Sequence, residues 1–139
     1  MSLRRQRCPF FTKTYKEIIL NILIIEDEIL IQQSLKKLIS RRGHNVSTSS
    51  LGRDAINLIS HNEFDRIICD LMLQDISGFD IIEESKAKLG FDGIKNKFII
   101  ITAYSSEQVL KQANSYGCKV LNKPFLDINQ AINDMLGEI

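Results

Sequence analysis

The sequence lacks long hydrophobic runs and any strong excess of one charge. Its longest purely apolar runs are four residues, at 22–25 and 98–101, whereas a membrane-spanning helix needs about 20 apolar residues. The 18 basic and 17 acidic side chains leave a net charge of +1, which is not the profile of a dedicated nucleic-acid-binding protein. We therefore expect no membrane span, and no nucleic-acid binding by this chain alone.

A regular cysteine or histidine pattern is also absent. The three cysteines, Cys8, Cys69 and Cys118, are odd in number and form no Cys-x-x-Cys pair. Two of them lie in apolar, strand-like contexts. This pattern favours reduced thiols without a metal-binding role, in a cytoplasmic protein. His44 and His61 are isolated from each other and from any ligand spacing, so we expect them in loops or at the surface.

The remaining composition is that of one globular domain. The chain has 139 residues, of which 44% are hydrophobic and 25% charged, which excludes a disordered chain, a collagen-like fibre and a disulfide miniprotein. Residues 1–20 carry five basic side chains and one acidic one. No apolar segment follows the arginines, so this stretch is not a secretory signal. We expect 1–20 to be a flexible basic extension, with contact to phosphate or lipid headgroups as the alternative, and 21–139 to be the domain.

Short apolar runs alternate with amphipathic segments along this domain. Strands are predicted at 22–25, 44–48, 66–69, 98–101 and 119–122. Apolar stripes at helical spacing lie between and after them, at 31–39, 51–59, 79–89, 105–116 and 128–136. Five such strand–helix units predict an α/β fold, with a parallel sheet that has helices on both faces. Ligands of such sheets bind outside the carboxyl ends of the strands.

Polar side chains follow four of the predicted strands directly. They are Glu26, Asp27 and Glu28, then Asp70, then Thr102, and finally Lys123. Taken singly, each has an ordinary structural explanation, because acidic and hydroxyl residues often cap the next helix. Together at one edge, the carboxylates need a cation to stay ionised. Oxygen ligands suit Mg²⁺, and the ammonium and hydroxyl groups suit phosphoryl oxygens. The pattern predicts phosphoryl transfer to a carboxylate nucleophile.

The same segments carry a resemblance to a known family. They are the apolar run that ends in Glu26 and Asp27, the segment DLMLQDISG at 70–78, IITA at 100–103 and KPF at 123–125. From about Asn21 to Leu136, the sequence resembles the receiver domain of two-component response regulators. The resemblance implies a doubly wound, flavodoxin-like sheet of five parallel strands in the order 2-1-3-4-5, flanked by five helices.

The resemblance also implies a phosphoacceptor site. Asp70 would be phosphorylated by a histidine kinase or a histidine phosphotransfer protein. Mg²⁺, or Mn²⁺ in its place, would be bound by Asp70, by Asp27 directly, by Glu26 through water, and by the backbone carbonyl of Met72. The chain would be a signalling switch rather than an enzyme, with slow autodephosphorylation, and would act on a downstream protein partner.

Further side chains would set how the switch responds. Thr102 and Lys123 would hold the phosphoryl oxygens. Met72 and Tyr104 would flank the approach of a hydrolytic water, and neither is a competent base. Many receivers have an aromatic residue where this chain has Val120, whose β-branched side chain is stiff. We therefore expect the loop that carries Tyr104 to transmit the signal, with the fifth strand more passive.

Some features depart from the family or leave alternatives open. Gln74 replaces the usual proline, and the resemblance favours a cis bond between Lys123 and Pro124. A haloacid-dehalogenase-like phosphohydrolase is the alternative function, but such an enzyme would need an aspartate where Met72 stands, and the chain has no room for a cap domain. The sequence does not decide between a stand-alone receiver and an excised part of a larger kinase or regulator.

Overall fold

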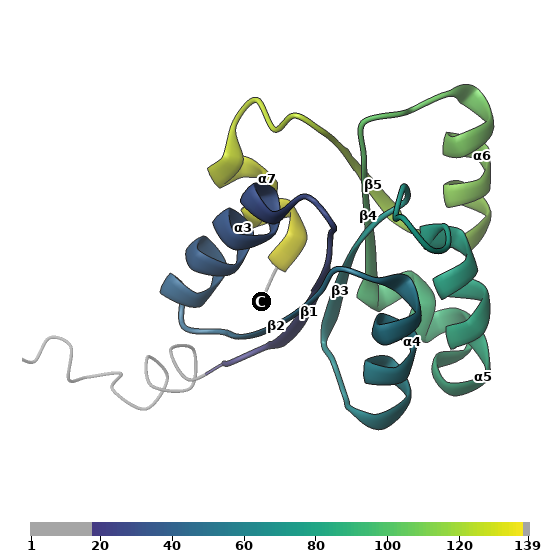
Figure 1. Ribbon diagram of the computed structural model, residues 1–139, viewed down its shortest axis with the longest axis horizontal. Helices are drawn as coiled ribbons and strands as arrows, with labels where there is room; N and C mark the ends of the chain where they lie inside the picture. Colours follow the sequence, from purple (N-terminus) through teal and green to yellow (C-terminus); the bar gives the residue numbers. More distant parts are fainter. Residues whose placement is uncertain (1–17, 138–139) are drawn as a thin grey trace, which may run out of the picture.

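The computed structural model describes residues 18–137 of the chain (Figure 1). Residues 1–17 lie outside the described residues, and with them Cys8 and most of the expected basic extension. Within 18–137, five strands alternate with five helices. No helix in this part of the chain is long and apolar enough to cross a lipid bilayer.

The elements follow the predicted order, and most of their ends lie within two residues of the predicted ones. The strands are β1 (Asn21–Ile25), β2 (Asn45–Ser49), β3 (Arg66–Asp70), β4 (Phe98–Thr102) and β5 (Lys119–Asn122). The helices are α3 (Ile29–Arg41), α4 (Gly52–His61), α5 (Gly78–Lys97), α6 (Glu107–Tyr116) and α7 (Ile128–Leu136).

All strand pairs are parallel, and the order in the sheet is β2-β1-β3-β4-β5, as predicted. Helices α3 and α7 cover one face, and α4, α5 and α6 cover the other (Figure 1). Both faces are buried, which is why the central strands are continuously apolar. Along β1, Leu23 packs toward the three-helix side and Ile24 toward α3 and α7, as the two-residue period of a strand requires.

Helix α5 is longer than the predicted segment 79–89. Its first segment ends at Gly90, which has a φ of 71°, a left-handed conformation that glycine adopts without a Cβ clash. A second helical segment then continues to Lys97 and buries Ile94 completely. The residues around Ile94 are mostly polar, so the hydrophobic pattern gave no sign of this segment.

Capping residues set the starts of two other helices. Helix α6 begins at Glu107, two residues later than predicted, because Ser106 is its N-cap and accepts a hydrogen bond from the N–H of Val109. In α7, the predicted N-cap Asp127 accepts a hydrogen bond from the N–H of Gln130.

The cysteines and histidines within residues 18–137 are explained by burial, hydrogen bonding or a helix end. Cys69 and Cys118 are free and buried, and burial raises the pKa of the Cys118 thiol to about 11 and that of Cys69 further above its usual range. His44 accepts a hydrogen bond from the backbone N–H of Leu20 at 3.0 Å, and His61 ends α4.

Candidate functional site

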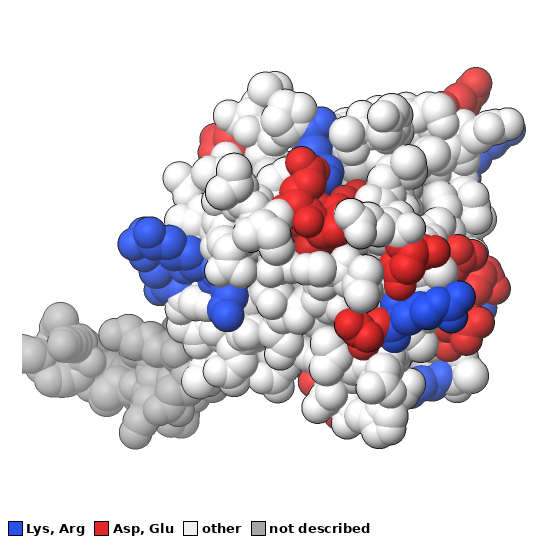
Figure 2. All heavy atoms as spheres, in the orientation of Figure 1, with Lys and Arg blue, Asp and Glu red and all other residues white. Residues whose placement is uncertain are grey.

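The strand register brings the predicted site residues to one edge of the sheet. The last residue of β1 pairs with Cys69, so the next residues along the two strands, Glu26 and Asp70, lie side by side. Thr102 ends β4, and the backbone N–H of Lys123 donates to its carbonyl oxygen at 2.8 Å. The bond between Lys123 and Pro124 is cis, as expected. On the side of the molecule shown in Figure 2, acidic side chains gather near the middle, with basic atoms beside them.

An acidic cluster forms the centre of this edge. One carboxylate oxygen from each of Glu26, Asp27 and Asp70 lies within 4.8 Å of the others. Glu26 and Asp70 are buried, and Asp27 is half-buried beside a pocket of about 260 Å³. Oxygens on opposite sides of one Mg²⁺ lie about 4.2 Å apart, since each is about 2.1 Å from the ion. The three carboxylates therefore fit a divalent cation with only small movements.

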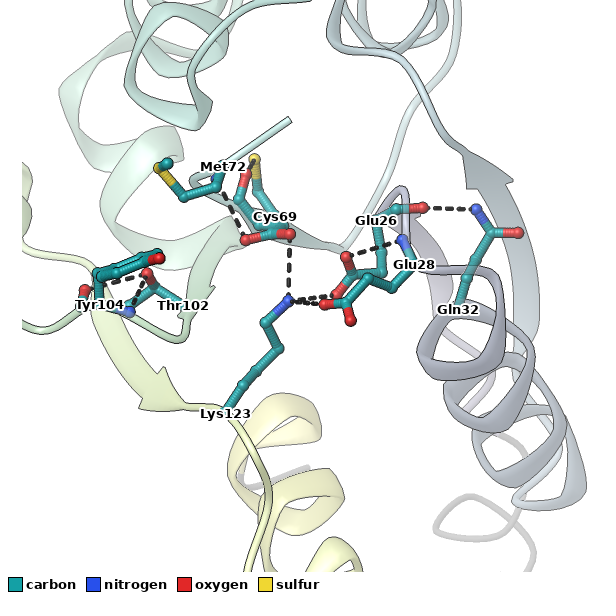
Figure 3. A network of polar contacts seen from close by, with 9 residues as sticks. Glu26, Glu28, Gln32, Cys69, Met72, Thr102, Tyr104 and Lys123 are labelled. Atoms are coloured by element: carbon teal, nitrogen blue, oxygen red, sulfur yellow. Dashed lines mark hydrogen bonds and ion pairs between the residues drawn. The ribbon is translucent and has the colours of Figure 1, made fainter. Parts of the chain in front are cut away.

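The ammonium group of Lys123 lies among the carboxylates (Figure 3). Its Nζ is 3.0 Å from Glu26 Oε1, 3.2 Å from Asp70 Oδ2 and 2.9 Å from Glu28 Oε1. The side chains of Lys123, Glu26 and Asp70 are at most 6% exposed. Because one cation faces several carboxylates, the site keeps an excess of negative charge.

Burial, together with this excess charge, perturbs the ionisation of the site. Burial raises the pKa of Glu26 to about 7, and the neighbouring Asp70 carboxylate adds to the effect. Burial and Asp70 also raise the pKa of Asp27. Burial alone would lower the pKa of Lys123, but its bonds to Glu28 and Glu26 outweigh that effect, so its pKa lies above the usual range. The cluster can bind either a proton or an additional cation near neutral pH.

A short loop after β3 forms one wall of the pocket. The backbone N–H of Met72 donates to Asp70 Oδ1 at 3.2 Å, which orients the carboxylate. Met72 also forms an antiparallel bridge with Ser77, so the loop folds back on itself before α5. Gly78 is required there, because a Cβ would lie 2.7 Å from the carbonyl oxygen of Asp70. The role of the Met72 carbonyl as a metal ligand stays a prediction.

Thr102 is close to the site but points its hydroxyl at its own loop. Its Oγ1 donates to the carbonyl oxygen of Tyr104 and accepts from the Tyr104 N–H, both at 3.0 Å (Figure 3). Thr102 is fully buried, whereas Tyr104 is 63% exposed at the edge of the pocket. Val120 is half-buried against the core on the α4–α6 side. The Thr102 hydroxyl could donate to a phosphoryl group only if its hydrogen bond to the Tyr104 carbonyl oxygen broke.

Similar proteins of known family all point to one kind of domain. The sequence profile of the response regulator receiver domain matches residues 22–134. The chain belongs to the response regulator receiver domain family. Response regulator SaeR of Staphylococcus aureus (strain USA300) is 30% identical over 106 residues, which cover 76% of this chain and 44% of SaeR. The chain therefore spans less than half the length of that relative.

Solved receiver domains share the fold. The non-phosphorylated receiver domain of HemR from Leptospira biflexa matches with a TM-score of 0.73 and 26% identity, covering 81% of this chain and 88% of that one. The receiver domain of the sensor histidine kinase PA1611 from Pseudomonas aeruginosa PAO1, solved with a magnesium ion in its active site cleft, matches with a TM-score of 0.70 and 21% identity. That match covers 87% of this chain and 100% of the other.

Two polar residues of this receiver domain have contacts that were not predicted from the sequence. Helix capping was the ordinary explanation for Glu28. It is the N-cap residue of α3, but its side chain makes no capping hydrogen bond and pairs with Lys123 instead. Gln32 is buried in α3 and donates to the carbonyl oxygen of Glu26 at 2.8 Å and to Ser50 Oγ at 3.2 Å. The signal for Gln32 was present, because it lies on the apolar stripe of α3, where a polar side chain needs a partner.

Proposed function

We propose that this receiver domain accepts a phosphoryl group on Asp70 from the phosphohistidine of a histidine kinase or a histidine phosphotransfer protein. In that step the phosphorus–nitrogen bond breaks, the Asp70 carboxylate forms a phosphorus–oxygen bond, and the imidazole leaves. The observation that carries the proposal is a buried carboxylate at the pocket, held between an acidic cluster and an ammonium group. Family membership supports the choice of donor.

Each neighbour of Asp70 has a proposed task. Lys123, already 3.2 Å from Asp70 Oδ2, would neutralise the charge of the incoming phosphoryl oxygens. The Met72 N–H holds Oδ1 and so fixes the plane of the nucleophile. Glu26 and Asp27, with Asp70, would hold Mg²⁺, and the PA1611 receiver was solved with a magnesium ion in its active site cleft. The backbone carbonyl of Met72 would be a further ligand of this ion. When bound, this ion would supply positive charge that offsets the carboxylates and the transferred group.

The output would depend on the loop after β4. We propose that phosphorylation draws the Thr102 hydroxyl away from the Tyr104 carbonyl, so that the loop carrying Tyr104 and the start of α6 change conformation. Val120 would take little part, because it is half-buried and stiff. Amide chemical shifts recorded on adding beryllofluoride and Mg²⁺ would test this. Changes confined to β5 and α7, with Tyr104 to Val109 unaffected, would contradict it.

The proposed function is tested by intact mass measurement after incubation with acetyl phosphate. We expect one added phosphoryl group with Mg²⁺, none with EDTA, and none in the Asp70→Asn variant. Labelling that persists in Asp70→Asn would reject the assignment. Sustained turnover of a generic phosphate ester by the unmodified chain would instead favour a phosphohydrolase.

A further inference from the structure

The loop between β3 and α5 is tied to a helix that is distant in sequence. Asp75 Oδ1 accepts a hydrogen bond from the backbone N–H of Gly52 at 2.8 Å, and Oδ2 accepts one from the N–H of Arg53 at 2.9 Å. These N–H groups lie in the first turn of α4, whose own N-cap residue, Leu51, provides no side-chain acceptor. A carboxylate from another segment therefore caps α4, where the helix dipole favours negative charge.

A second contact at the same place is apolar. A Cβ on Gly52 would lie 2.4 Å from Cγ1 and 2.9 Å from Cδ1 of Ile76. The Ile76 side chain therefore occupies the space that glycine leaves open at the start of α4. Because Ile76 directly follows Asp75, one polar and one apolar contact hold the same part of the loop.

The other end of this short loop belongs to the phosphoacceptor site. Met72, three residues before Asp75, donates its N–H to Asp70 and forms the antiparallel bridge to Ser77. The bridge closes the loop, so Asp75 and the Met72 backbone belong to one closed turn. Gln74, the residue before Asp75, is exposed and does not restrict the backbone as a proline would.

We propose that Asp75 is a positioning residue of the phosphoacceptor site, and that its double hydrogen bond to the start of α4 holds the Met72 backbone in its place beside Asp70. The proposal rests on the proposed function, in which the Met72 carbonyl is a ligand of Mg²⁺. The N–H groups of Arg53 and Gly52 also lower the pKa of Asp75. Its carboxylate therefore stays ionised at neutral pH and keeps both hydrogen bonds.

The test is the Mg²⁺ affinity of variants, measured by calorimetry or by amide shifts during titration with MgCl₂. Removing a residue that orients a metal ligand weakens metal binding by about 10–100-fold, and Asp75 acts one step further away. We expect Asp75→Ala to weaken Mg²⁺ binding by ~3–10-fold and to accelerate hydrogen exchange of the Met72 amide. Asp75→Asn, which keeps one acceptor oxygen, should lie in between. It also serves as the test variant if Asp75→Ala does not fold.

A matched control separates loop positioning from helix capping. Asp54 is exposed in the first turn of α4. Asp54→Ala therefore also removes a negative charge from the start of that helix, but it keeps both hydrogen bonds of Asp75 to α4. It should lower stability and leave the Mg²⁺ affinity unchanged. Adding Gln74→Pro to Asp75→Ala should recover part of the lost affinity, because proline stiffens the loop directly.

The possible results distinguish this proposal from the proposed function. If the unmodified chain binds no Mg²⁺, or if Asp27→Asn binds it equally well, the proposed site itself is wrong. If the unmodified chain binds Mg²⁺ and Asp27→Asn does not, but Asp75→Ala and Asp75→Asn bind as tightly as the unmodified chain, only the role of Asp75 is wrong. An equal loss of affinity in Asp54→Ala would also overturn that role.

Discussion

Replacing Asp27 by asparagine should stabilise the fold and at the same time remove the response to Mg²⁺. The Asp27 carboxylate lies within 4.8 Å of oxygens from Glu26 and Asp70, and burial and Asp70 raise its pKa. An ionised Asp27 therefore opposes folding. The amide of asparagine has nearly the same shape and carries no charge.

The size of the effect follows from the distance. At the upper limit of 4.8 Å between these oxygens, two unit charges repel by ~3.5 kcal/mol at an effective dielectric constant of about 20 and by ~0.9 kcal/mol at about 80. Asp27 is only half-buried, and attraction to Lys123 offsets part of the repulsion. We expect Asp27→Asn to raise the free energy of unfolding by ~1–2 kcal/mol in EDTA, which corresponds to an increase of about 4–8 °C in Tm.

Urea unfolding followed by circular dichroism, in EDTA and in MgCl₂, measures both effects. The unmodified chain should gain ~1.4 kcal/mol when Mg²⁺ is present at ten times its Kd, and Asp27→Asn should gain almost nothing. Asp92→Asn is the control, because Asp92 is exposed in the second segment of α5. A loss of stability in EDTA, or an unchanged gain from Mg²⁺, would refute the account of charge repulsion at this site.

Three further predictions concern other parts of the molecule. Met72 and Tyr104 are 59% and 63% exposed beside the pocket, so replacing both with serine should speed phosphate loss, followed as the phosphorylated fraction over time; an unchanged rate would contradict steric shielding. Burial lowers the pKa of His44 below 6.5, so the fold favours the neutral imidazole, which accepts the hydrogen bond from Leu20. The stability that this imidazole contributes is complete above pH 6.5 and is lost as the pH falls. The difference in Tm between the unmodified chain and His44→Gln should therefore shrink toward pH 5, and a constant difference would argue against this. Gly78→Ala, whose Cβ would lie 2.7 Å from the Asp70 carbonyl oxygen, should cost about 1–3 kcal/mol in urea unfolding; an unchanged midpoint would show that the loop yields freely.

The positions of the main site residues could be predicted because the topology alone determines them. Once five strand–helix units predict a parallel sheet, residues that directly follow the strands must meet at one edge. Glu26, Asp70 and Lys123 were placed together in this way, and the structure brings them within hydrogen-bond distance. The strand order followed from the family resemblance, and the sheet has that order.

Contacts that depend on the path of a loop could not be predicted. Asp75 reaches the first turn of α4 only because the loop after β3 bridges back on itself, and no periodicity encodes that path. The side chain of Glu28 could have capped α3 or faced the pocket, and only the position of Lys123 decides between them. The second segment of α5 escaped prediction because a single buried residue, Ile94, anchors it.

The central claim is that Asp70 is the phosphoacceptor. Reduction of the phosphorylated chain with borohydride converts an acyl phosphate at an aspartate into homoserine, which peptide mass spectrometry locates along the sequence. The account predicts homoserine at position 70 alone, after incubation with acetyl phosphate and Mg²⁺, and none when EDTA is present. Homoserine at another acidic residue of the cluster, such as Asp27, or a phosphoryl group that resists reduction, would contradict it.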